Sequence, residues 1–311
     1  MQKVFAAATC LFVVAGAESG KVTFNRGPDR VEVLLNGQPV TAFRFNPKWD
    51  KPFLYPIRTL SGTVISRGYP VESRPGEEQD HAWHRGIWYG HGDVNGEDFW
   101  REKADGTTSR LVMDGEPKTS ANTLDVRLAM MTPKGKRLGT IRETYAFSRD
   151  GPNLLIDSTI SVIANGGEAL RFGDTDDGGF AVRLSDDFRQ DRGAELINSE
   201  GLTGTENIWG RPARWVKYSA KINGRSTGVA ILDHPSNLRS PTGWHARRYS
   251  LNAANPFATG SFARKKNPAE GAWTLPAGET LTLRYLLIIH DGELNPAGVE
   301  RYFQTFAKDQ R

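Results

Sequence analysis

The segment from Asp80 to Trp100, DHAWHRGIWYGHGDVNGEDFW, concentrates residue types that perform chemistry. It holds three of the six histidines and three of the eight tryptophans of the chain, together with several carboxylates and glycines. Imidazoles supply acid–base or ligand chemistry near neutral pH, tryptophans offer flat stacking faces, and glycines let the backbone turn sharply. The segment therefore predicts a site, with the candidate residues His81, His84, Trp88, His91, Asp93, Asn95 and Trp100.

The first two of these histidines, His81 and His84, are open to three interpretations. Their spacing lacks the glutamate and the helical separation of the zinc-protease pattern, but they could supply two metal ligands with His245 as a third. The surrounding glycines and tryptophans favour a metal-free polar site instead. The last interpretation is that the histidines only hydrogen-bond their loop. We predict that the protein has no bound metal and no other cofactor.

The run Asp93-x-Asn95-Gly96-x-Asp98 has some features of a calcium loop. Its glycine comes too early for that loop, which needs three oxygen side chains at alternate positions before the glycine. A turn stabilised by Asp and Asn side chains is the favoured interpretation. Asp93 and Asn95 could still bind sugar hydroxyls from such a turn.

Two further places offer carboxylates for acid–base work. Asp176 lies in an acidic cluster before a predicted strand, where a raised pKa would suit catalysis, although an exposed acidic turn is an equal alternative. Glu143 lies on the apolar face of its predicted strand, so its carboxylate needs a partner. Arg183 is the candidate partner, and Glu143 is then either half of a structural ion pair or a catalytic base.

A last group of candidates follows a predicted buried strand. His234 comes directly after it, and Trp244, His245 and Arg247 lie about ten residues further on. An indole, an imidazole and a guanidinium so close together predict a site for an anionic or polyhydroxylated ligand. Trp244 is also a candidate for the core, where most tryptophans reside.

Alternation of apolar and polar residues dominates the rest of the chain. Asn36-Gly37 and Asn223-Gly224 each lie between alternating runs, which is the strongest short signal for a β-hairpin. The segment 281–289 is apolar almost throughout, as expected of a central strand covered on both faces.

One helix is clear, at the end of the chain. Asn295 is a candidate N-cap, Pro296 takes the first helical position, and apolar residues then repeat at helical spacing. Many strands, frequent glycine turns and little helix predict an all-β fold, a large β-sandwich with a C-terminal helix. No repeat or long linker divides the chain, so we expect a single domain over residues 18–311.

The first seventeen residues predict export. A basic start, an apolar run and Ala15-Gly16-Ala17 match a signal peptide over residues 1–17, so the expected location is periplasmic or secreted. Cys10 is the only cysteine, so the mature chain would have no disulfide and no thiol chemistry. The formal charge of +4 comes from scattered residues, and we predict no nucleic-acid partner and no membrane span in the mature chain.

Several motifs resemble a bacterial exported family usually labelled PmoA-like, or "methane oxygenase PmoA". They are KPFLYP at 51–56, the 80–100 segment, FGD and GGF within 172–180, DHP at 233–235, PTGWH at 241–245, ANPF at 254–257 and HDG at 290–292. The resemblance covers nearly the whole mature chain. It departs at Trp83, where the family often has a histidine, and this weakens any role that needs a third histidine there. The resemblance implies an exported protein of unsettled activity, similar in general look to the long β-sandwiches of the mutarotase-like group.

The combination of imidazoles, carboxylates and indoles in a β-rich chain predicts an exported carbohydrate-active protein. Our first hypothesis is an enzyme that acts on a sugar or sugar derivative as a lyase, epimerase or hydrolase. In it His84 and His245 are the acid and base, and Glu143 or Asp176 is an acidic partner. A non-catalytic carbohydrate-binding or accessory protein is the alternative. A metal-dependent oxidase, in the sense of the family label, is the third.

Overall fold

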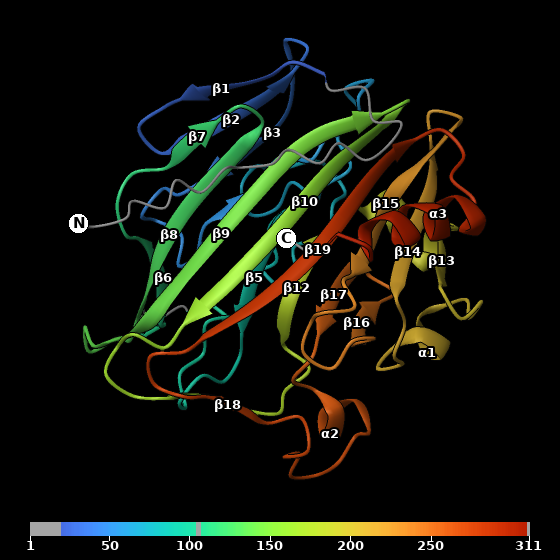
Figure 1. Ribbon diagram of the computed structural model, residues 1–311. Helices are drawn as coiled ribbons and strands as arrows, with labels where there is room; N and C mark the ends of the chain where they lie inside the picture. Colours follow the sequence, from blue (N-terminus) through green and yellow to red (C-terminus); the bar gives the residue numbers. More distant parts are fainter. Residues whose placement is uncertain (1–19, 104–106, 310–311) are drawn as a thin grey trace.

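The computed structural model describes residues 20–103 and 107–309. The predicted signal peptide, including Cys10, lies outside the described residues. Within these ranges the chain forms two large antiparallel sheets that pack face to face (Figure 1). The predicted all-β sandwich is confirmed.

The first sheet carries the candidate site. Within the described ranges its eight strands follow the order β1 (Val22–Arg26), β2 (Arg30–Leu35), β3 (Gln38–Arg44), β4 (Phe53–Leu54), β5 (Ile87–His91), β12 (Gly178–Arg183), β17 (Leu251–Asn255) and β16 (Gly243–Arg247). Its middle therefore joins strands from distant parts of the chain.

The second sheet is built around long neighbouring strands. Its order is β13 (Glu195–Asn198), β14 (Trp215–Ile222), β15 (Arg225–Asp233), β19 (Thr280–Asp291), β10 (Asn153–Ile163), β9 (Arg137–Asp150), β8 (Thr123–Met131) and β6 (Arg110–Met113), and β7 (Lys118–Ser120) also pairs with β8. The predicted central strand is β19, between β15 and β10. A small separate sheet pairs β11 (Leu170–Phe172) with β18 (Trp273–Leu275).

Both predicted Asn-Gly hairpins are present. Asn36 and Gly37 have φ angles of 53° and 81°, and they join β2 to β3. Asn223 and Gly224 have φ angles of 51° and 80°, and they join β14 to β15. Two successive residues with positive φ match the right-handed twist of the flanking strands, which explains the preference for this dipeptide.

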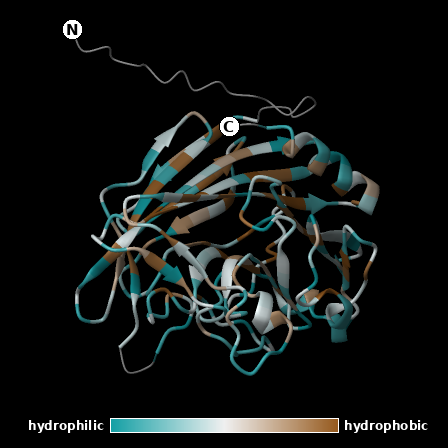
Figure 2. Ribbon diagram, turned by 60° about the horizontal axis from the view of Figure 1, so that its bottom comes forward, coloured by the Kyte–Doolittle hydropathy of each residue, from teal (hydrophilic) through white to brown (hydrophobic). Residues whose placement is uncertain are grey.

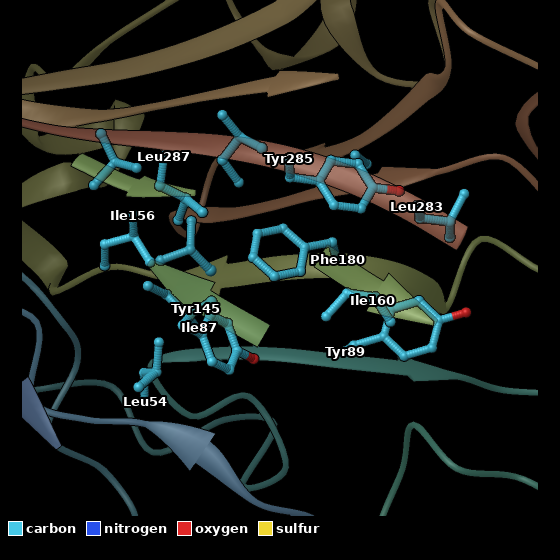
Figure 3. Close-up of a cluster of buried hydrophobic side chains, with 14 of the residues drawn as sticks. Leu54, Ile87, Tyr89, Tyr145, Ile156, Ile160, Phe180, Leu283, Tyr285 and Leu287 are labelled. Carbon is cyan, nitrogen blue, oxygen red and sulfur yellow. The ribbon is translucent and has the colours of Figure 1, made fainter. Parts of the chain in front are cut away.

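The core lies between the two sheets. Leu54, Ile87, Tyr89 and Phe180 reach it from the first sheet and meet side chains of β9, β10 and β19 (Figure 3). The ring of Phe180 stacks on that of Tyr285, with the centroids 4.8 Å apart. Along the long strands hydrophobic residues alternate with more polar ones, as Figure 2 shows. One face of each sheet is thereby buried against the other.

The predicted C-terminal helix is α3 (Pro296–Phe306), and the Asn295 side chain caps it by accepting a hydrogen bond from the Gly298 amide. Val299, Phe303 and Phe306 pack on the outer face of the second sheet. The other helices are short: α1 (Thr205–Ile208), α2 (Thr259–Phe262) and the 3₁₀ turns Asp186–Phe188 and Gln190–Arg192. In the part of the chain that the structure describes, no helix is long and apolar enough to cross a membrane.

Candidate functional site

The site is built on the outer face of the first sheet, because side chains alternate between the two faces along each strand. In β16, Trp244 and Ala246 enter the core, so His245 and Arg247 project from the outer face. In β12 the same alternation places Arg183 on the outer face. The backbone of Gly86, just before β5, packs closely against the backbone of Leu54 in β4. Only glycine fits there, because a Cβ atom would lie 1.9 Å from the Leu54 carbonyl oxygen.

A buried arginine holds the loop that carries the first two histidines. The guanidinium of Arg67 donates to the carbonyl oxygens of Asp80, His81 and His84 at 2.7, 2.8 and 3.1 Å. Burial lowers the pKa of Arg67 to about 10, so it remains charged at neutral pH. Three carbonyls fixed by one rigid guanidinium leave this loop little freedom.

Asp80 and His81 form a dyad. The Nδ1 atom of His81 lies 2.7 Å from Oδ2 of Asp80, and Oδ1 of Asp80 accepts a hydrogen bond of 2.7 Å from Arg183 and another from Arg67. Burial alone would raise the pKa of Asp80, but His81 and the two guanidiniums hold it well below its usual range. Asp80 is therefore a carboxylate that fixes the proton of His81 on Nδ1.

The other ring nitrogen of His81 is available for chemistry. The side chain is 36% exposed, and Nε2 makes no hydrogen bond to any of the described residues. The backbone of His81 has a φ of 41°, in the left-handed region that residues other than glycine seldom adopt. Such conformations cluster at functional sites, where the surrounding contacts impose them.

His84 lies beneath this dyad. Its ring stacks on His81 at 4.9 Å and on Trp88 at 5.3 Å, and Arg183 Nη1 lies 3.4 Å from its Nδ1 atom. Because Arg183 can only donate, Nδ1 accepts and the proton resides on Nε2. Burial, reinforced by Arg183, lowers the pKa of His84, which is therefore neutral. Its Nε2 atom is buried and has no partner among the described residues.

His245 has both ring nitrogens engaged. Nδ1 donates to the Asp176 carbonyl oxygen at 2.6 Å, and Nε2 accepts from Nε of Arg247 at 2.7 Å. Burial lowers the pKa of His245, Asp176 opposes the shift, and Arg247 reinforces it. The geometry therefore favours a neutral positioning residue that orients Arg247, and not the acid or base expected from the sequence.

The three histidines nevertheless share one electrostatic environment. Burial and the charge of Arg183 are the largest causes of the lowered pKa of His84, and the nearby His81 and His245 lower it further. Tyr249 stacks on His81 at 5.1 Å, and its pKa is raised to about 12 by burial while the charge of Arg247 opposes the rise. Tyr249 thus lies within reach of both the dyad and the His245–Arg247 pair.

The tryptophans of the site differ in exposure. Trp88 and Trp100 are fully buried, with ring centroids 5.1 Å apart, so they support the site from below and cannot stack on a ligand in the described conformation. Trp83 is partly exposed. The indole nitrogens of all three tryptophans are buried and have no partner in the described chain. The same holds for Nε2 of His84. Buried donors normally have partners, so these nitrogens are exceptions.

Glu143 is on the wrong side of the first sheet to act with these histidines. It projects from β9 into the core, beside Tyr145, whose hydroxyl donates to it at 2.9 Å. Burial raises the pKa of Glu143 to about 7. Arg183, the partner that the sequence suggested, pairs instead with Asp80 on the outer face. The predicted Glu143–Arg183 pair is wrong.

Three other candidates serve the fold. Trp244 lies in the core, and its indole donates to the Ala213 carbonyl oxygen at 2.9 Å. His91 is buried among aromatic rings, with Nε2 2.8 Å from the Gly173 carbonyl oxygen, and burial lowers its pKa to about 4. His234 packs against Phe306 of α3, at the second sheet.

Asp93 and Asn95 stabilise a turn. Asp93 accepts from the Gly96 amide at 2.9 Å. Asn95 accepts from the Arg171 amide at 2.6 Å and donates to the Ala169 carbonyl oxygen at 3.0 Å. These side chains tie the turn to the strand β11 and are occupied, which matches the turn interpretation and leaves little capacity for sugar hydroxyls.

Several residues of the site escaped the sequence analysis. They are Arg67, Asp80 and Tyr249, which hold or flank His81. Asp80 stands directly before His81 in the sequence, and that adjacency was the available signal. Arg67 and Tyr249 come from distant segments, and nothing in the sequence pairs them with the loop.

The described residues contain no group of three or more His, Cys, Asp or Glu side chains arranged to hold a metal ion. His81 and His84 present parallel ring faces to each other, with an interplanar angle of 1°. The nitrogens of His245 are occupied as described above. The prediction that the protein binds no cofactor stays a prediction.

The fold and site define a two-sheet β-sandwich with a histidine- and arginine-rich outer face. The chain belongs to a family of unknown function (DUF6807), whose model matches residues 30–304. No curated protein matches it in sequence.

Among solved structures, the chain is similar to a galactose mutarotase related enzyme from Lactobacillus acidophilus, with 10% identity over 88% of this chain and 100% of that one, and a TM-score of 0.41. A galactose mutarotase-like protein from Lactobacillus casei gives 9% identity over 86% and 100% of the two chains, with a TM-score of 0.39. A GH36 alpha-galactosidase from Geobacillus stearothermophilus gives 10% identity over 88% and 41%, with a TM-score of 0.34. At TM-scores this low, the similarities say nothing about what this chain binds.

Proposed function

We propose that the chain is an exported carbohydrate-active enzyme that uses the Asp80–His81 dyad for acid–base chemistry on a sugar or sugar derivative. The observation that carries the proposal is the pairing of an ionised, doubly clamped carboxylate with a partly exposed imidazole whose Nε2 atom is unused. A base oriented by a second group is the recurring arrangement of proton-transfer sites.

The dyad moves a proton at a defined atom. Asp80 accepts the Nδ1 proton of His81, so the lone pair of Nε2 faces outward and takes a proton from a substrate hydroxyl, a C–H group or a water. The imidazolium that forms is stabilised by the Asp80 charge. The same Nε2 atom can then return the proton, which serves a lyase, an epimerase or a hydrolase.

The surroundings of the dyad suit a polyhydroxylated ligand. Trp83 and Tyr249 offer partly exposed aromatic faces, on which sugar rings commonly pack. Asp176 and Arg247 are 31% and 39% exposed, and they supply an acceptor and a donor for hydroxyl groups. We propose that the chemistry needs no bound metal, and that the signal peptide delivers the protein to the periplasm or the exterior. The PmoA-like resemblance agrees with export.

The decisive variant is His81→Asn. Asparagine tolerates the left-handed backbone at this position and keeps a donor for Asp80, but it cannot accept a catalytic proton. We expect turnover to fall roughly 10²- to 10⁴-fold, the usual contribution of general acid–base catalysis, while binding and thermal stability are retained. His234→Asn removes an imidazole that contacts Ser236 and Phe306 and not the dyad, and it serves as the control.

The measurement uses a defined panel of neutral and acidic monosaccharides and their trisaccharides. Proton NMR of the anomeric signals monitors conversion, and calorimetry measures binding. If the wild-type protein converts a panel sugar and His81→Asn converts it at the same rate, the dyad is not the acid–base group. If the wild-type protein binds a sugar and leaves it unchanged, the non-catalytic binding protein is the correct function. The full engagement of His245 is the observation that favours this alternative.

A further inference from the structure

A cavity of about 410 Å³ lies beside the site, between the short helices α1 and α2. Its lining includes Trp209 and Arg211, which follow α1, and Phe262 and Arg264, at the end of α2 and just after it. Figure 1 shows both helices near the ends of β16 and β17. None of these residues belongs to the acid–base machinery described above.

The charges of this cavity are unbalanced. Arg211 and Arg264 line it against a single carboxylate, Glu206, and both arginines are exposed. Neither forms an ion pair with any of the described residues, unlike most arginines near the dyad. Two unpaired guanidiniums in one concave surface favour a ligand that brings negative charge.

Trp209 gives the cavity an aromatic wall. The Arg264 guanidinium lies 5.3 Å from the centroid of its ring, and the Phe262 ring meets it edge-on at 5.3 Å. The indole nitrogen of Trp209 is buried and lacks a partner among the described residues. Because this nitrogen is buried, it does not bind a ligand directly, but it can report on changes in the cavity wall.

Arg247 connects the cavity to the dyad's surroundings. Its guanidinium also lies 5.3 Å from the Trp209 ring centroid, and it donates to His245 and pairs with Asp176 at 3.3 Å. Its charge acts on Tyr249, which stacks on His81. Arg247 therefore lies between Trp209 of the cavity wall and the residues that flank the dyad.

We propose that this cavity is a subsite for the acidic group of a sugar, a carboxylate or a sulfate, so that the protein selects charged saccharides. The proposal rests on the proposed function, since a charged saccharide is one kind of the sugar ligand proposed above. Arg211 and Arg264 hold the anion by charge-assisted hydrogen bonds, and Trp209, whose ring lies under the Arg264 guanidinium, supports that arginine from the cavity wall. Neutral sugars lack the group that these arginines recognise.

The test uses three monosaccharides that differ only at C6: galactose, galacturonate and galactose 6-sulfate. Binding is measured by calorimetry and by the ¹⁵N shift of the Trp209 indole, which Trp209→Phe assigns. We expect at least one acidic sugar to bind roughly tenfold tighter than galactose and to shift the Trp209 signal. The two acidic probes distinguish a carboxylate from a sulfate. The preference should weaken as salt is raised.

The double variant Arg211→Ala with Arg264→Ala should remove the preference and leave the binding of galactose unchanged. Arg301→Ala, an exposed arginine on α3, is the matched control and should keep the preference. Equal affinity for the three sugars, or a preference that survives the double variant, overturns the subsite. Inorganic sulfate that binds as tightly as galactose 6-sulfate also overturns it, since the cavity then holds a bare anion.

The two proposals fail in different ways. If acidic sugars bind at Trp209 but the wild-type protein never converts a sugar, the subsite stands and the acid–base function falls. If sugars are converted with no dependence on charge, the function stands and the subsite falls. His81→Asn should abolish conversion while the acidic sugar still shifts the Trp209 signal.

Discussion

The two faces of the first sheet use the same strands for opposite purposes. In β16 the inward side chains are Trp244 and Ala246, and the outward ones are His245 and Arg247. In β12 the inward residue Phe180 stacks on Tyr285, while Arg183 projects to the other side and clamps Asp80. A shift of one residue in register would exchange the two faces completely.

The faces also differ in how they satisfy polar groups. Towards the second sheet, the core is apolar apart from isolated groups such as Glu143, which has one hydrogen-bond partner. On the outer face, buried cations and carboxylates pair with each other. Buried polar atoms without a partner occur on both faces, such as the indole nitrogens of Trp88 and Trp100 on the outer one and the hydroxyls of Tyr89 and Tyr285 on the inner one. The inner face is therefore mainly an apolar core, whereas the outer face holds a network of paired charges.

A pair of tryptophans gives the largest expected contrast. Trp244→Ala on the inner face should destabilise the protein by about 3–5 kcal/mol, since it opens a cavity and leaves the Ala213 carbonyl oxygen without its donor. Trp83→Ala on the outer face should cost about 1 kcal/mol or less, because Trp83 is partly exposed. Denaturant unfolding measures both, and equal losses would contradict the division of roles.

Glu143→Gln tests a buried carboxyl of the core interior whose pKa is raised. In the folded protein the pKa is about 7, so the folded state holds a proton that the unfolded chain has released at pH 5–7. The contribution of Glu143 to stability should therefore fall by roughly 3 kcal/mol as pH rises from about 4.5 to 7 and then level off, whereas buried His91, whose pKa is lowered to about 4, contributes in the opposite direction. The difference in stability between the variant and the wild type isolates the contribution of Glu143.

The neutral amide of the Glu143→Gln variant keeps an acceptor for the Tyr145 hydroxyl, so the substitution should remove this decline and leave the variant more stable at pH 8. Unfolding curves at several pH values provide the measurement. A difference in stability between the variant and the wild type that is flat across this range would show that Glu143 ionises freely.

Local sequence was sufficient for the elements of the fold. Asn36-Gly37 fixes its hairpin because both residues accept positive φ, and Asn295-Pro296 fixes the start of α3 by capping. The apolar run of β19 identified a central strand. Pairings across the chain were not predictable, since β12 lies between β5 and β17 for reasons that no single segment contains.

The sequence singled out the segment that carries His81 and His84 but not the residues that surround it in the fold. Alternation correctly placed Glu143 on an apolar face, yet it could not say that this face is turned away from the histidines. The exposure of His81 and the burial of His84 depend on Arg67, which is distant in the sequence. Both nitrogens of His245 are engaged by groups whose positions only the folded sheet determines.

Asp80→Asn probes the carboxylate of the outer face at acidic pH. Because the pKa of Asp80 is lowered in the folded state, its contribution is present above the unfolded pKa and is lost as pH falls through the folded value. Asp80 is 30% exposed, but its partners Arg67 and Arg183 are fully buried, so the loss of its charge should cost about 1–3 kcal/mol at neutral pH. The gap in stability between the variant and the wild type should narrow below pH 4. A gap that persists unchanged at lower pH would mean that charge is not what Asp80 contributes.

Arg247→Gln should give the smallest change in stability and a specific change at its neighbour. The side chain is 39% exposed and pairs with a carboxylate that is itself exposed, so its removal should cost under about 1 kcal/mol. Burial is the main cause of the lowered pKa of His245, Asp176 opposes it, and the charge of Arg247 adds to it. Removing that charge in the variant should therefore raise the pKa of His245. ¹⁵N NMR of the imidazole follows the titration, with Arg301→Gln as a control of equal charge change. The prediction is wrong if Arg247→Gln lowers the melting temperature by several degrees and leaves the titration of His245 unchanged. Arg247 would then be a structural residue, and the outer face would resemble the inner face more closely than its charges suggest.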